Sequence, residues 1–284
     1  MLPPDIVKKV TRFDFQHETV KYHPKIALTM AKAAKLAYFP PEQVTPFMEQ
    51  DWQFQTCFFM AQQETQGYIF ANDQVIIVSF RGTNALQDWF TNFDIFLPTP
   101  DAFGGVHPGF QKALNLVWNM QFPNGAVGLE NYLRSLQQEK VRSLWFTGHS
   151  LGAALATLAT ARLREKDIPV YGLYTFGSPR LGDRDFERLF NQDFKSRSFR
   201  FVYNNDTVTR VPPRAVNYSH VGAFLYLTSQ NEIKTDPFFW LQFLDRMQGR
   251  ADDFLKPGTD GIKDHRIDGY IDVLAKNLNQ SIEL

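Results

Sequence analysis

Residues 146–154 read Phe-Thr-Gly-His-Ser-Leu-Gly-Ala-Ala and fit the pattern Gly-x-Ser-x-Gly, centred on Ser150. In this pattern the serine occupies a sharp strand-to-helix turn, and the two glycines remove side chains that would clash there. Residues 144–146 are typical of a buried strand, and the small-residue run 153–159 is typical of a closely packed helix. We therefore predict that Ser150 is a nucleophile rather than a helix cap. His149 is expected to be a packing residue, or one that supports the residues touching the substrate, rather than the base.

The start of a helix after Ser150 also predicts a site for an oxyanion. Free N–H groups and the positive end of the helix dipole face the position where a tetrahedral oxyanion would form, so the Leu151 N–H is the first expected donor. A second donor is expected after an early core strand, and residues 80–83 end such a strand. Thr83 is the candidate, with helix capping as its alternative role, whereas Arg81 is expected to form a structural ion pair.

Apolar patterns along the chain alternate between strand and helix. This alternation predicts a three-layer α/β sandwich, with a central, mostly parallel sheet and helices on both faces, in which the first strands are antiparallel. Residues 1–284 are expected to form a single domain, because no linker or repeat interrupts the pattern. The expected strands are 55–61, 67–71, 74–80, 143–147, 170–176, 198–203 and 224–228, and the expected helices are 26–38, 109–120, 127–138, 151–164, 184–190 and 267–274.

The composition excludes several classes of protein. The 30 basic residues balance the 30 acidic ones, so no net charge favours nucleic acid or an anionic membrane as a partner. No apolar run reaches the roughly 18 residues of a membrane-spanning helix. Cys57 is the single cysteine, and the sequence begins without an apolar leader, which together favour a cytoplasmic location, with a secreted mature form as the alternative. Nothing in the sequence indicates the oligomeric state.

Six motifs and a late histidine, His265, follow one another in an order that resembles a known family. The motifs are Val78-Ser79-Phe80-Arg81-Gly82-Thr83, Asp88-Trp89-x-x-Asn92, Val106-His107-x-Gly109-Phe110, Gly148 to Ala156, Thr175-Phe176-Gly177-Ser178-Pro179-Arg180 and Asn204-Asn205-Asp206-x-Val208. Together they cover roughly residues 20–280, which is far more specific than one short motif. The sequence resembles the class 3 lipases, the filamentous-fungus triacylglycerol lipase type of the α/β-hydrolase superfamily.

A serine nucleophile needs a histidine to remove its proton and a carboxylate to orient that histidine. In α/β-hydrolases the acid follows the serine along the chain, at the carboxyl end of a strand. Asp206 follows the strand-like residues 199–203 and a turn, and the resemblance selects it too. Asp183 and Asp185 are the competing acids, but both lie at the start of an expected helix, where capping explains them.

Two histidines downstream of Asp206 are candidates for the base. His265 precedes an expected helix, and the resemblance implies that the pair Asp264-His265 carries the base. His220 is the alternative, although it stands in a segment that resembles a structural part of the family. We assign the base to His265 and keep His220 as its rival.

An amphipathic segment lies at about residues 84–98, directly after Thr83. Its apolar side carries Leu86, Trp89, Phe90 and Phe93 at helical spacing. The resemblance implies that this segment is a lid that opens at a lipid surface, and the alternative is an ordinary packed surface helix. An aromatic-rich insertion at about 232–256 is expected to line an acyl pocket or contact lipid through residues 236–247, or to form a packed cap.

The resemblance implies carboxylic-ester hydrolysis through an acyl-enzyme, without a metal or organic cofactor. Triacylglycerol at a lipid surface is the first expected substrate, which implies transient contact with that surface. Phospholipase A1 or feruloyl-type esterase activity is the alternative. A different class of function, a non-catalytic scaffold that binds lipid or protein, is disfavoured because the serine, acid and histidine are all present.

Overall fold

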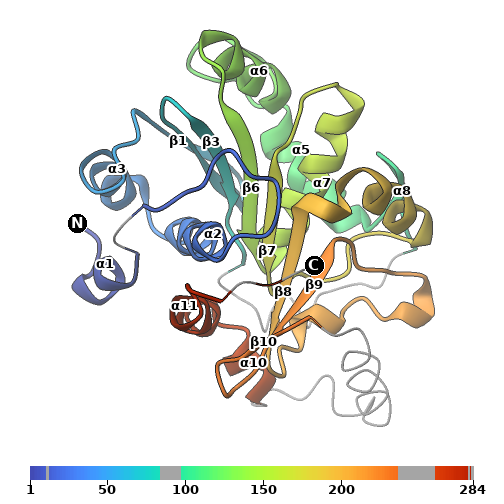
Figure 1. Cartoon of the computed structure of the whole chain (residues 1–284). Helices are drawn as coiled ribbons and strands as arrows, with labels where there is room; N and C mark the ends of the chain where they lie inside the picture. Colours follow the sequence, from blue (N-terminus) through green and yellow to red (C-terminus); the bar gives the residue numbers. More distant parts are fainter. Residues whose placement is uncertain (11–12, 84–96, 236–259, 281, 283–284) are drawn as a thin grey trace.

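The computed structural model describes residues 1–10, 13–83, 97–235, 260–280 and 282 (Figure 1). In these residues the centre of the molecule is one eight-stranded sheet in the order β1-β2-β3-β6-β7-β8-β9-β10. Its strands are β1 (Thr56–Gln62), β2 (Thr65–Ala71), β3 (Val75–Phe80), β6 (Ser143–His149), β7 (Gly172–Phe176), β8 (Ser198–Tyr203), β9 (Ala223–Leu227) and β10 (Ile233–Lys234).

Strand directions divide the sheet into an antiparallel start and a parallel body. β1, β2 and β3 pair antiparallel, and the turn between β2 and β3 is closed by Asn72, whose Oδ1 accepts hydrogen bonds from the Gln74 and Val75 N–H groups, both at 2.9 Å. The pairs β3–β6, β6–β7, β7–β8 and β8–β9 are parallel, and β10 returns antiparallel to β9. The predicted antiparallel start and parallel centre are confirmed.

Helices cover both faces of this sheet, as Figure 1 shows for α2 and α11 on one side and α5 and α7 on the other. The first face packs against α1 (Pro4–Val10), α2 (Pro24–Leu36), α3 (Pro41–Gln50) and α11 (Ile267–Lys276). The second face packs against α5 (Pro108–Trp118), α6 (Leu129–Glu139), α7 (Leu151–Glu165) and α8 (Arg184–Phe194).

Successive strand residues enter opposite cores. Ile77 and its register partner Trp145 belong to the first core, whereas Val78 and its partner Phe146 belong to the second. Because side chains alternate along a strand, a strand that is buried on both faces reads as a continuous apolar run, which is the pattern of β3 and β6. The predicted three-layer α/β sandwich is therefore confirmed.

Several short elements differ from the prediction. Pro40 and Pro41 were expected only to stop the helix predicted at 26–38. The helix α2 ends earlier, at Leu36, and Pro41 begins α3, because proline is well suited to the first turn of a helix. The short helices α1 and α10 (Asp260–Asp264), the 3₁₀ turns η1 (Lys195–Arg197), η2 (Val208–Arg210) and η3 (Arg214–Val216), and the small two-stranded sheet were not predicted.

Two predicted segments lie outside the described residues. They are the helix of the expected lid, with Leu86, Trp89, Phe90 and Phe93, and the aromatic segment 236–247. Both assignments remain predictions, as does the assignment of residues 1–284 to a single domain. Within the described ranges, no helix is both long enough and apolar enough to cross a bilayer.

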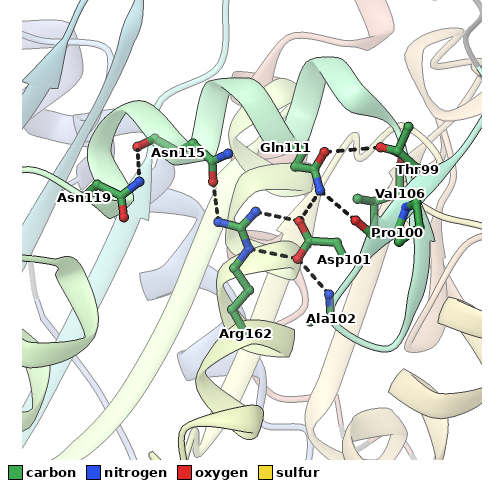
Figure 2. A network of polar contacts seen from close by, with 9 residues as sticks. All are labelled: Thr99, Pro100, Asp101, Ala102, Val106, Gln111, Asn115, Asn119 and Arg162. Carbon is green, nitrogen blue, oxygen red and sulfur yellow. Dashed lines mark hydrogen bonds and ion pairs between the residues drawn. The ribbon is translucent and has the colours of Figure 1, made fainter.

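The small sheet consists of β4 (Thr99–Asp101) and β5 (Gly104–Val106) and is held by a polar network (Figure 2). Asp101 accepts two hydrogen bonds from the Arg162 guanidinium, at 2.9 and 2.6 Å, and one from Gln111 at 2.7 Å. Arg162 belongs to α7 and also donates to Asn115 of α5 at 2.7 Å. The network therefore fixes the hairpin to the helix that begins at Ser150.

Replacement of Asp101 by asparagine is expected to lower the free energy of unfolding at pH 7 by about 1 to 3 kcal/mol, because it leaves a nearly buried guanidinium without its anion. Burial raises the pKa of Asp101, but hydrogen bonds from Arg162, the Ala102 N–H and Gln111 outweigh burial, so the net shift is downward. This stabilisation is fully present above the unfolded-state pKa of about 3.9 and is lost as the pH falls through the lower folded-state pKa.

Urea denaturation of wild type and Asp101→Asn at pH 7 and at pH 3 measures this effect. The matched control is Asp73→Asn, because Asp73 pairs with Lys140 where both side chains are at least half exposed, and its loss should leave stability unchanged. An equal effect of the two substitutions at pH 7 would contradict the role given to Asp101.

Candidate active site

Ser150 occupies the turn between β6 and α7. Its backbone has φ 60° and ψ −130°, a conformation that residues other than glycine rarely adopt. Its N–H donates to the Phe176 carbonyl oxygen at 3.0 Å. The residue is 1% exposed. Backbone strain of this kind persists only where the surrounding structure enforces it, so the fold holds Ser150 in this turn.

Two glycines allow the turn to form. A Cβ atom added to Gly148 would lie 2.3 Å from the Gly152 backbone, and one added to Gly152 would lie 2.1 Å from the Phe80 carbonyl oxygen. The strand β6, the helix α7 and the end of β3 therefore meet backbone to backbone, which explains the glycine two residues either side of Ser150.

The Gly152→Ala substitution is expected to destabilise the protein by about 3 kcal/mol or more, because the added methyl group meets main-chain atoms that cannot move independently. A loss of stability would be informative, because at a helix position with free space alanine is more stable than glycine by about 1 kcal/mol. Chemical denaturation measures the effect, with Gly125→Ala as the control. Gly125 has φ +82° but nothing within 4 Å of an added Cβ, so only backbone strain of about 1 to 2 kcal/mol is expected there. Equal losses in both variants would contradict the close packing.

Of the two residues expected to stabilise an oxyanion, Leu151 directly follows Ser150, and Thr83 belongs to a loop that approaches it. Leu151 is the first residue of α7, where the N–H groups have no acceptor within the helix. Thr83 follows Gly82, and a Cβ added to Gly82 would lie 3.0 Å from the Ser150 Cβ atom. The loop after β3 is thus in contact with the predicted nucleophile. Arg81 holds this loop to β2 by donating to the Gln66 side-chain amide oxygen, where the sequence predicted an ion pair.

Asp206 follows β8 after a two-residue turn and is buried. Its Oδ1 accepts a hydrogen bond from the Val208 N–H at 2.9 Å, and its Oδ2 accepts one from the Tyr270 hydroxyl of α11. His265 Nδ1 lies 2.8 Å from Oδ2 and 2.9 Å from Oδ1. Since an ionised carboxylate only accepts hydrogen bonds, Nδ1 carries the proton and Nε2 is left as a proton acceptor.

His265 lies between α10 and α11 and is 3% exposed. The preceding residue, Asp264, accepts hydrogen bonds from the Asn204 side chain at 2.9 Å and the Asn205 N–H at 3.2 Å, which ties the loop of His265 to the loop of Asp206. Within the described residues, neither His265 Nε2 nor Ser150 Oγ has a hydrogen-bond partner. Both atoms are therefore available for a reaction that brings them together.

Gly177 lies directly against Asp206 and His265. It directly follows β7 and has φ +60°, and a Cβ atom there would lie 2.8 Å from Asp206 Oδ2 and 2.8 Å from His265 Cε1. The Asp206 and His265 side chains thus pack directly against the main chain at Gly177.

His149, the residue before Ser150, is buried beneath this pair. Its Nδ1 lies 2.7 Å from the Tyr38 hydroxyl, its Nε2 lies 2.6 Å from the His265 carbonyl oxygen, and its ring centroid lies 4.4 Å from that of His265. Its predicted packing role agrees with this position. Tyr38 and Tyr270 were not predicted as parts of the site, since an isolated tyrosine carries no sequence signal, whereas Asp264 was noted through the resemblance of the pair Asp264-His265.

The rival residues have other partners. His220 Nε2 lies 2.8 Å from the Thr209 carbonyl oxygen, and burial, together with Arg200 and Arg180, holds the pKa of His220 well below its usual value. Asp183 caps α8 by accepting a hydrogen bond from the Phe186 N–H at 2.8 Å, as expected. Asp185 is an exposed first-turn residue of the same helix.

Comparison with known proteins gives a consistent result. Residues 77–216 match the model of the family "Lipase (class 3)". A secreted mono- and diacylglycerol lipase of Fusarium solani is 33% identical over 58% of this chain and 44% of its own length, and a triacylglycerol lipase of Arabidopsis thaliana is 30% identical over 72% and 49%. The chain thus spans about half the length of these curated relatives.

Solved structures are similar as well. A lipase of Rhizopus microsporus var. chinensis aligns with a TM-score of 0.59 and 26% identity, covering 80% of each chain. A Rhizomucor miehei triacylglyceride lipase aligns with a TM-score of 0.61 over 84% of this chain and 90% of its own, at 19% identity, which supports the fold alone.

These relatives correct one prediction. The cytoplasmic location expected from the sequence is wrong, because the relatives of Fusarium solani and Penicillium cyclopium are secreted. A single cysteine does not report the compartment, since a chain of this size has enough buried apolar surface to be stable without disulfides. Cys57 itself is half-buried in β1, and burial raises the pKa of its thiol to about 11.

Proposed function

The chain belongs to the class 3 lipase family, and we propose that it is a serine carboxylic-ester hydrolase that cleaves acylglycerol esters. The observation that carries the proposal is the buried hydrogen bond between His265 Nδ1 and Asp206, beside a serine held in a strained turn. Ser150, His265 and Asp206 offer a nucleophile, a base and an orienting acid, the three groups that acyl transfer by a serine requires.

In the proposed reaction, Ser150 Oγ attacks the ester carbonyl carbon while His265 Nε2 removes the hydroxyl proton. Asp206 keeps the proton on Nδ1 and stabilises the imidazolium that forms. The N–H groups of Leu151 and Thr83 donate to the oxyanion. His265 then gives its proton to the leaving glycerol oxygen, and water, activated by the same histidine, releases the acid from the acyl-enzyme.

Contact with a lipid surface is part of the proposal. Only 1% of Ser150 is exposed, so an ester reaches its hydroxyl only after the atoms that cover it move. The amphipathic pattern of residues 84–98 supports a lid in that role. Phospholipase A1 activity is the second candidate, because a phospholipase A(1) of Arabidopsis thaliana is 30% identical over 48% of this chain.

Release of the carboxylic acid from emulsified tri-, di- and monoacylglycerols, from phosphatidylcholine and from a feruloyl ester tests the proposal. We expect the acylglycerols to be cleaved fastest, with a rise in rate where the substrate concentration exceeds its solubility limit. Faster cleavage of phosphatidylcholine would favour the second candidate. Rates equal to those of buffer on every ester, with no labelling of Ser150 by a fluorophosphonate, would refute ester hydrolysis.

A further inference from the structure

Four distant segments of the chain meet around the ring of His149. Tyr38 follows α2, Gly82 follows β3, His149 ends β6 and His265 precedes α11. The His149 ring contacts the Tyr38 hydroxyl through one nitrogen and the His265 main chain through the other. Tyr38 in turn takes part in a backbone hydrogen bond with Gly82, whose Cα lies so close that an added Cβ would be 2.2 Å from the hydroxyl oxygen.

The chemistry of these groups fixes the direction of each hydrogen bond. A carbonyl oxygen only accepts, so His149 Nε2 carries the proton that is donated to the His265 carbonyl. Nδ1 is then an acceptor, and the Tyr38 hydroxyl donates to it. The Gly82 N–H donates to the Tyr38 oxygen. Burial, and secondly the nearby His265, hold the pKa of His149 well below its usual value, which keeps the ring neutral as this pattern requires.

We propose that His149 and Tyr38 are positioning residues that set the main chain of His265 and the loop of Thr83 relative to Ser150. This inference rests on the ester hydrolysis proposed above. The bond from His265 Nδ1 to Asp206 orients the imidazole about its own axis, but it does not fix the main chain that carries the ring. The hydrogen bond from His149 Nε2 to the His265 carbonyl oxygen fixes that main chain. The hydrogen bond from the Gly82 N–H to the Tyr38 oxygen holds Gly82, the residue before Thr83.

The position of His149 makes this link direct. His149 is covalently joined to Ser150, so the hydrogen bond from its ring links the His265 main chain to the residue that precedes the nucleophile. A displacement of His265 by about 1 Å would misalign proton transfer and can cost about 100-fold in rate. The contribution should therefore appear in kcat, whereas substrate binding, which does not involve these groups, should change little.

Glutamine separates positioning from simple packing. Its amide offers one donor and one acceptor, as neutral His149 does, whereas leucine fills a similar volume without either. We expect His149→Leu to lower kcat by about 10- to 100-fold with KM within about twofold, and His149→Gln to recover most of the loss. Tyr38→Phe should lower kcat by about 10-fold. Tyr68→Phe is the control, because its buried hydroxyl donates to the carbonyl oxygen of Phe39, the residue after Tyr38, and so holds the same segment without bonding His149.

A double variant tests whether the two residues act as one chain. Tyr38→Phe combined with His149→Leu should be no slower than His149→Leu alone, because either change already breaks the chain. Thermal unfolding accompanies each variant. If His149→Leu does not fold, Tyr38→Phe and His149→Gln still provide the comparison with Tyr68→Phe.

A spectroscopic readout separates this inference from the proposed function. The hydrogen-bonded Nδ1 proton of His265 gives a far-downfield proton NMR signal, which should shift in His149→Leu and stay in place in Tyr68→Phe. Shifts in that signal in a protein that cleaves no ester would refute the function and support the positioning. Unchanged kcat and an unchanged signal in folded Tyr38→Phe and His149→Leu would overturn the inference.

Discussion

Replacing Ser150 by alanine is expected to lower kcat for ester hydrolysis by about 10⁵- to 10⁶-fold. The hydroxyl is the only group of Ser150 that can form the acyl-enzyme, and alanine removes it. Hydrolysis of p-nitrophenyl esters of short and long chain by both proteins measures the difference.

The control is Ser79→Ala. Ser79 is fully buried in β3, and its hydroxyl donates to the Ala33 carbonyl oxygen at 3.0 Å, so its loss should cost about 1 kcal/mol of stability while leaving activity near that of wild type. Equal and negligible rates in wild type and Ser150→Ala would instead favour a non-catalytic scaffold that binds lipid or protein.

The second large effect concerns the base. His265→Ala is expected to lower kcat by about as much as the loss of the serine, because the two groups act as one unit. His220→Ala should retain activity within about tenfold of wild type, since its imidazole bonds to the Thr209 carbonyl and lies beside arginines rather than a carboxylate. Both substitutions remove an imidazole that has a hydrogen-bond partner, buried in His265 and partly buried in His220, which makes them a suitable pair for comparing activity.

The reverse result would be decisive. A folded His265→Ala variant with wild-type kcat, together with an inactive and folded His220→Ala variant, would move the base to His220. Circular dichroism and thermal unfolding of the two variants exclude trivial loss of the fold.

Much of the fold was predictable because the pattern of apolar residues is unambiguous. β8 was predicted at its observed bounds, and β3, β6 and α7 to within two residues at each end, because each is either a continuous apolar run or a long small-residue helix. α3 was missed for a physical reason, since a proline that ends one helix can also begin the next. The β4–β5 hairpin has three residues per strand, too few for a period of two to be read.

The site was predictable to a different degree at each residue. The strand-to-helix turn at Ser150 could be predicted from the local sequence alone. The position of Asp206 could be predicted because it follows the end of an expected strand. The choice of His265 over His220 depended on resemblance, since both lie downstream of the acid. The contacts of Tyr38 and Tyr270 could not be predicted, because they join residues 111 and 64 positions apart through the tertiary fold.

The close approach of Gly177 to the acid and base has a consequence for surveys of genomes. A methyl group at this position would push against Asp206 and His265 while leaving the serine, the acid and the histidine unchanged in the sequence. Homologues that carry a larger residue there would pass a search for the three reacting side chains and still be poor enzymes. A filter for active members should therefore read the residue aligned with Gly177 alongside the triad itself.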